Sequence, residues 1–197
     1  AEVLLRRAAE VEAEVAREGS DFGVRSRTVS VGGQLVSLQG LHSLFDDVPV
    51  ALYGEHQASN ASVALAAVEA FFGPERPLPD EIVHEAFATV TSPGRLEVVR
   101  RNPTVLVDAA HNPHGARVLA SAIEESFAFE YIVGVVSVMG DKDVRGVLEA
   151  LEPVCNDLVV TWNGSPRAMA ADDIYALAID IFGDSRVTKS ADLASAI

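Results

Sequence analysis

Cysteine, basic residues and long apolar runs are all scarce in this sequence of 197 residues. Its one cysteine, Cys155, excludes a disulfide within the chain, which fits a reducing compartment, and we expect a cytoplasmic protein. Lys and Arg number 15 against 29 Asp and Glu, a net charge of −14 that argues against a nucleic-acid partner. No apolar run reaches the roughly 18 residues of a membrane helix, so no membrane partner is expected.

Several binding motifs are also missing. No G-x-x-x-x-G-K-[ST] phosphate loop occurs, and no G-x-G-x-x-G follows an expected strand, which disfavours a dinucleotide-dependent oxidoreductase. No Cys/His cluster has zinc-site spacing, so we assign no metal ligand in this chain. The sequence lacks an initial Met, and both its ends fall inside helical patterns, so we expect a piece of a longer protein.

Apolar residues make up 49% of the chain, enough for a folded core, and their pattern changes at "TSPGR", residues 91–95. Before this point we expect a helix over 2–18, a hairpin turning at Gly32-Gly33, and helices over about 53–72 and 79–90. After it, strands and helices alternate. We expect strands at 96–100, 104–108, 130–138, 157–162 and 186–188, and helices at 113–127, 143–152, 171–182 and from 190.

This alternation predicts an α/β fold in which residues 93–197 form a Rossmann-like domain, with a mostly parallel sheet flanked by helices. Residues 1–92 form a second part of the chain. In such sheets ligands bind beyond the carboxyl ends of the strands. Three expected strand ends carry polar side chains, at residues 108–112, 137–143 and 162–167.

The stretch "VLVDAAHNPHGA" places an acid and an imidazole where a helix begins. Asn112 is a good N-cap and Pro113 a good first helical residue, so backbone N–H groups and a partial positive charge point toward the preceding loop. That end suits a phosphate or carboxylate. Asp108 and His111 either act on such a ligand or only satisfy the backbone of their own loop, and both interpretations stay open.

Four blocks, "GEHQASNASVALAA", "SPGRLEVV", "VLVDAAHNPHGA" and "VMGDKD", occur in this order. Together they resemble the bacterial folylpolyglutamate synthase/dihydrofolate synthase family, a branch of the Mur-type ATP-dependent amide ligases. The resemblance implies that ATP, with Mg²⁺, activates a carboxylate of folate or dihydropteroate as an acyl phosphate. The amine of L-glutamate then attacks it. It also implies a monomer.

The resemblance further implies that residues 1–92 are the C-terminal part of the ATP-binding domain, the P-loop-type central domain of Mur ligases. Residues 93–197 would be the Mur ligase C-terminal Rossmann-like domain. The phosphate loop, a carbamoylated lysine and most Mg²⁺ ligands would then lie upstream, so we expect this chain to be inactive alone.

By the same resemblance, Asn60 helps to hold adenine. His56 and Gln57 lie about one helical turn earlier on the same face and are further candidates for contact with the nucleotide. A polar residue on a solvated helix face is the alternative for Asn60. Arg95 corresponds to an arginine that reaches the ATP phosphates when the domains close, a contact that suits a guanidinium.

The resemblance assigns Asp108 and His111 to the catalytic centre, near ribose, phosphate and the site of acyl transfer. Either residue could instead orient the incoming glutamate, and the sequence does not separate these roles. Lys142 resembles a loop lysine that binds the incoming amino acid, although Asp141 and Asp143 beside it also favour a helix start. Arg167 matches a recurrent Pro-Arg-Ala position, to which we assign no role.

Two other functions compete with this one. Another Mur-type ligase, such as a UDP-muramoyl peptide amino-acid-adding enzyme, would share the chemistry, but "GRLE" followed by "DAAHNP" favours the folate branch. A non-catalytic nucleotide-binding module is the other possibility, because the phosphate loop is missing.

Overall fold

In a computed structural model, which describes residues 2–197, the chain splits into two compact units. The first ends at Ser92 and the second begins at Pro93. Within residues 2–197 no helix combines the length and apolar character that crossing a membrane would require.

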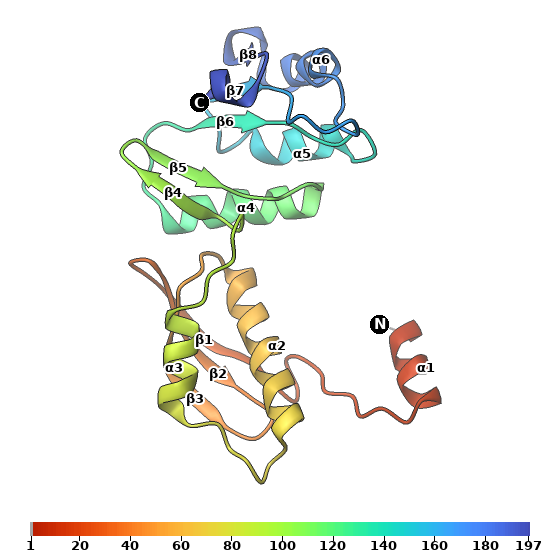
Figure 1. The fold of residues 1–197 in the computed structure, drawn as a ribbon, viewed down its shortest axis with the longest axis vertical. Coiled ribbons are helices and arrows are strands. Elements are labelled where there is room, and N and C mark those ends of the chain that lie inside the picture. Colours follow the sequence, from red (N-terminus) through yellow and green to blue (C-terminus); the bar gives the residue numbers. More distant parts are fainter. Residues whose placement is uncertain (1) are drawn as a thin grey trace. The chain divides into compact units, whose positions relative to one another are not determined.

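The first unit is an antiparallel sheet, in the order β1-β2-β3, with two helices packed on one face (Figure 1). Alternate residues of β2 and β3, such as Val36, Leu38 and Phe45, form its core with Leu65 and Val83 of the helices. Its elements are α1 (Glu2–Glu10), β1 (Gly23–Ser30), β2 (Gly33–Gln39), β3 (Leu44–Val50), α2 (Glu55–Phe72) and α3 (Asp80–Ala88).

Two parts of this unit differ from the sequence prediction. The helix expected over 2–18 ends at Glu10, two residues before Glu12, whose backbone φ of 56° is not helical. None of the residues of α1 is buried, so packing does not stabilise a longer helix. Strand β3 was not predicted, because Asp46, Asp47 and Pro49 are poor strand formers. Pairing with β2 selects the strand, and the register shifts once along it.

Helix α2 is apolar on nearly all sides. One side packs on the sheet, but the opposite side exposes Val63, Val68 and Phe71, which are 47%, 42% and 84% exposed. A helix of this kind is usually buried all round.

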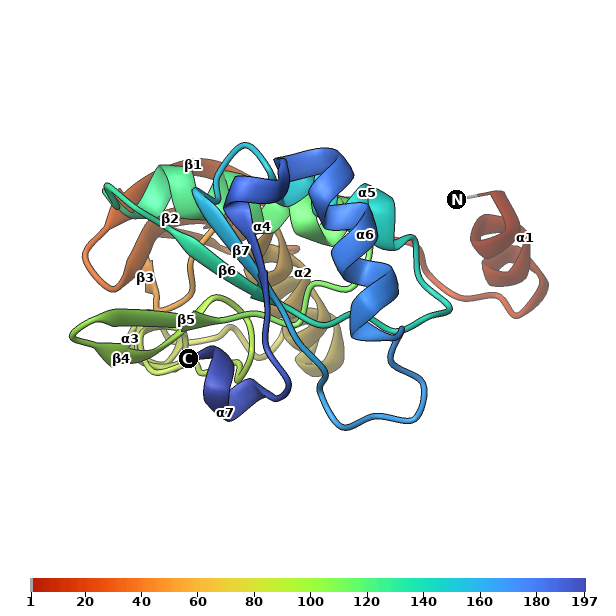
Figure 2. The same ribbon diagram turned by 90° about the horizontal axis from the view of Figure 1, so that it is seen from above.

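The second unit holds a parallel sheet in the order β6-β7-β8 and a separate antiparallel pair, β4-β5 (Figure 2). Val136, Leu158 and Val160 of the parallel strands pack against α5 and α6. The elements are β4 (Glu97–Arg101), β5 (Thr104–Val107), α4 (Pro113–Ser126), β6 (Val133–Val136), α5 (Val144–Leu151), β7 (Asp157–Val160), α6 (Ala171–Phe182), a short 3-10 turn (Asp184–Arg186), β8 (Val187–Lys189) and α7 (Leu193–Ala196).

The α/β class is confirmed, with two qualifications. Only two residues join β4 to β5, which permits antiparallel pairing alone, so these strands do not extend the parallel sheet. Helices were also expected on both faces, yet Val133 and Val135 of β6 remain 49% and 36% exposed on the face opposite Val136.

Arg186 ties the amino end of the parallel sheet together. Its guanidinium donates to the carbonyls of Asn156 and Cys155, at 2.8 and 2.6 Å, and pairs with Glu152 at 2.6 Å. The end of α5, the start of β7 and the start of β8 are thereby held by one side chain. Cys155 lies buried beside it.

Burial raises the pKa of the Cys155 thiol to about 11. At about pH 8 only about one thiol in a thousand would be ionised, against roughly one in four for an exposed cysteine. We therefore expect negligible labelling of the native protein by a chromogenic disulfide reagent at that pH, and rapid labelling in urea. Because the folded-state pKa is the higher one, the thiol's contribution to stability is present below the unfolded pKa and declines above it. Stoichiometric labelling of native protein would contradict this burial.

Candidate functional site

Asp108 fastens the loop after β5 to the segment before β4. One carboxylate oxygen accepts from the backbone N–H of Leu96 at 2.8 Å, and the other accepts from that of Ala110 at 2.7 Å. The N–H of Ala109 donates to the carbonyl of Gly94 at 2.8 Å. Asp108 therefore satisfies backbone groups of its own loop, which was one of its two interpretations. Its contact with a nucleotide stays a prediction.

Arg95 is presented by a tightly held turn. Its neighbours Gly94 and Leu96 both have left-handed backbones, with φ of 71° and 45°. For leucine this conformation costs about 1 kcal/mol, and burial of Leu96 together with its bond to Asp108 holds it in place. The N–H of Gly94 also donates to the carboxylate of Glu97, at 2.8 Å. The exposed Arg95 side chain makes no hydrogen bond or ion pair within residues 2–197 and is free to meet a ligand.

His111 is exposed at the start of α4, with Nδ1 3.0 Å from the carbonyl oxygen of Ala109. A carbonyl only accepts, so Nδ1 carries the hydrogen, and Nε2 of the neutral ring is an acceptor. Asn112 accepts from the N–H of Gly115 at 2.8 Å, and α4 begins at Pro113. The predicted helix start is confirmed.

Helix α5 begins beside α4. Asp143 caps it by accepting from the N–H of Gly146 at 3.0 Å. A Cβ on Gly146 would stand 2.6 Å from Cγ of Pro113, so glycine allows the first turns of the two helices to touch. His111 and Lys142, each one residue before a cap, therefore precede neighbouring helix starts with the same partial positive charge.

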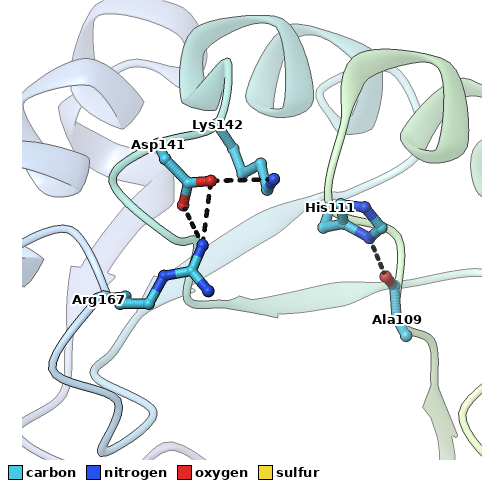
Figure 3. A network of polar contacts seen from close by, with 5 residues as sticks. All are labelled: Ala109, His111, Asp141, Lys142 and Arg167. Carbon is cyan, nitrogen blue, oxygen red and sulfur yellow. Dashed lines mark hydrogen bonds and ion pairs between the residues drawn. The ribbon is translucent and has the colours of Figure 1, made fainter.

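The loops after β6 and β7 are joined by a three-residue ion network (Figure 3). Nζ of Lys142 lies 3.0 Å from Asp141, and Nη2 of Arg167 lies 3.1 and 3.2 Å from the two oxygens of the same carboxylate. Lys142 first, and then Arg167, lower the pKa of the Asp141 carboxyl below its usual value. This network was not predicted: Asp141 was interpreted only as favouring a helix start, and Arg167 had no role.

In the first unit, two of the three predicted nucleotide-binding residues on α2 contact each other. Gln57 is buried, and its side-chain oxygen accepts from the amide of the exposed Asn60 at 3.1 Å. His56 is half-buried on the same turn. Gln34 of β2 anchors this helix start by donating to the carbonyls of Leu52 and Gly54, at 2.9 and 3.1 Å.

The predicted site residues thus form two groups. His56, Gln57 and Asn60 belong to the first unit, whereas Arg95, Asp108, His111 and Lys142 belong to the second. Amides suit the edge of a purine, and the second group offers cations and helix starts suited to anions. Within residues 2–197, no three His, Cys, Asp or Glu side chains come together as a metal site would require.

Comparison with known proteins gives consistent similarities. Residues 94–197 match the family model described as Mur ligase, glutamate ligase domain. The whole chain is 52% identical, over 198 residues, to the dihydrofolate synthase/folylpolyglutamate synthase of Mycobacterium tuberculosis, and it covers 41% of that relative. The enzyme of the same name from Bacillus subtilis is 30% identical over 145 residues, which are 73% of this chain and 34% of that relative.

Among solved structures, the folylpolyglutamate synthase of Mycobacterium tuberculosis complexed with ADP superimposes with a TM-score of 0.95 at 51% identity. The match covers 99% of this chain and 43% of that one. The chain therefore spans about two fifths of the length of these M. tuberculosis proteins. These similarities confirm the resemblance found in the four sequence blocks. The chain belongs to the Mur ligase family, and its residues 94–197 match the glutamate ligase domain of that family.

Proposed function

We propose that this chain is part of an ATP-dependent amide ligase that adds L-glutamate to folate or dihydropteroate through an acyl-phosphate intermediate. The observation that carries the proposal is the grouping of His111, Lys142 and two helix starts in a chain of this family. Such a grouping suits an anionic substrate, and glutamate carries two carboxylates.

We assign the incoming glutamate to Lys142 and His111. The ammonium of Lys142 would pair with a carboxylate, and the exposed His111 would offer Nε2, the ring nitrogen that is not bonded to Ala109. An unprotonated imidazole nitrogen is a base, so His111 would take the proton that the attacking amine loses. Asp108 would support this step by holding the loop that carries His111.

ATP supplies the phosphoryl group that turns the carboxylate into a reactive acyl phosphate, and we assign residues of each group to it. On α2, Asn60 and Gln57 offer amides that fit the adenine edge, and His56 lies on the same turn. Arg95, which has no partner within residues 2–197, fits the phosphates, and Asp108 would contact ribose or phosphate.

A Mg²⁺ ion is part of the proposal, but the described residues of this chain do not gather a ligand set for it. We therefore assign its ligands to the remainder of the protein and route no step through it. We also propose a monomer, as the family resemblance implies, and a cytoplasmic location, which the single cysteine fits. Size-exclusion chromatography of the full-length protein would test the oligomeric state.

We further propose that residues 1–92 complete an ATP-binding domain and that residues 93–197 are the C-terminal domain. The exposed apolar side of α2 supports the first assignment, because residues 2–92 leave Val63, Val68 and Phe71 exposed and a further part of an ATP-binding domain would bury them.

The isolated chain is expected to show no ATP-dependent glutamate addition, since its sequence contains no phosphate loop. The measurement is ADP release with dihydropteroate and glutamate, run beside the full-length protein. Activity in the full-length protein alone is the expected result. ADP release by the isolated chain that depends on both substrates would show that the missing part is dispensable.

Arg95→Ala in the full-length protein is expected to lower kcat by about 10³, the scale of a cation that stabilises a transferring phosphoryl group. Arg100→Ala is the matched control, because this exposed arginine lies in β4, directly after the turn that carries Arg95, and belongs to no proposed site. Its kcat should stay within about twofold of wild type. Near-normal turnover of Arg95→Ala would remove Arg95 from the proposed mechanism.

A further inference from the structure

The loops after β6 and β7 are fixed to each other by their backbones. The N–H of Gly140 donates to the carbonyl of Arg167 at 2.9 Å, and the N–H of Met169 donates to that of Val138 at 2.9 Å. Met139 and Ala168 form a bridge between these bonds. The backbone of Arg167 is therefore held in place beside the loop that carries Asp141 and Lys142.

Asp141 is a shared acceptor for two cations. Its carboxylate receives Lys142 and Arg167 together, so the three groups carry a net charge of +1. In Figure 3 the two cations approach from different sides, and Lys142 lies on the side toward His111. With Arg167 absent, Asp141 would neutralise Lys142 alone, and the surplus positive charge would be lost.

All three groups retain contact with water. The side chains of Lys142, Asp141 and Arg167 are 33%, 48% and 69% exposed, so each pair is weak enough to exchange. If Lys142 turned toward a substrate carboxylate, Arg167 would remain on Asp141. The acid would then keep a partner at every stage.

We propose that Arg167 is a positioning residue for the incoming amino acid: it holds Asp141 so that Lys142 can bind a substrate carboxylate. This inference rests on the proposed function. It assigns Arg167 no contact with the substrate, and its action passes entirely through Asp141.

The test uses the full-length protein and separates KM from kcat. Arg167→Ala is expected to raise the KM for glutamate about five- to tenfold, with kcat and the KM for ATP within about twofold. Arg167→Lys should have a KM for glutamate close to that of wild type, because an ammonium can still pair with Asp141. Arg167→Gln serves as a second neutral variant if the alanine variant folds poorly, as judged by its melting temperature.

A double-mutant cycle with Asp141→Asn supplies the sharper readout. Once Asp141 is neutral it no longer competes for Lys142, so adding Arg167→Ala should change the KM for glutamate by less than about twofold. A purely structural role of Arg167 would instead give additive effects in the double variant, and that outcome would overturn the inference.

Arg145→Ala is the matched control, because Arg145 of α5 also pairs with an exposed acid, Asp180, at 2.7 Å. Its KM for glutamate should equal that of wild type. An unchanged KM in Arg167→Ala would overturn this inference alone. A wild-type protein that adds no glutamate would overturn the proposed function, and the inference with it.

Discussion

The contact between Gly146 and Pro113 is the constraint on which the second unit depends. Any side chain at Gly146 would collide with Pro113 and with Asp143, so the absence of a Cβ lets α4 and α5 begin side by side. Each helix then needs its own cap, which Asn112 and Asp143 supply. His111 and Lys142, which directly precede these caps, are thereby placed at adjacent helix starts. The close packing at Gly146 therefore brings together two residues that we assign to the substrate.

The local parts of the fold were predictable from sequence, because their causes lie within a few residues. Alternation around Gly32-Gly33 predicted the β1-β2 hairpin, and Asn112-Pro113 predicted the start of α4. The parts that failed depend on distant partners. Strand β3 forms against β2 despite a poor composition, and α1 stops at Glu10 because none of its residues is buried against the rest of residues 2–197. Secondary structure of this kind is decided by tertiary contact rather than by propensity.

The same division holds for the site. Sequence patterns pointed to Asp108, His111 and Lys142 one by one, and Asp108 and His111 do lie in a closely bonded loop. No pattern could pair Asp141 with Arg167, because 26 residues separate them and each is common at a protein surface. The bond from the N–H of Leu96 to Asp108 was equally hidden, since it forms only when β4 folds back along β5.

The hydrogen bond between Nδ1 of His111 and the carbonyl of Ala109 has a consequence for how this ring can change its charge. A proton that this ring takes up can settle only on Nε2, since Nδ1 already holds one. The bond to Ala109 is the same before and after, so the loop keeps its shape while Nε2 switches from acceptor to donor. The imidazole can thus change from hydrogen-bond acceptor to donor toward a bound ligand with no rearrangement of the chain.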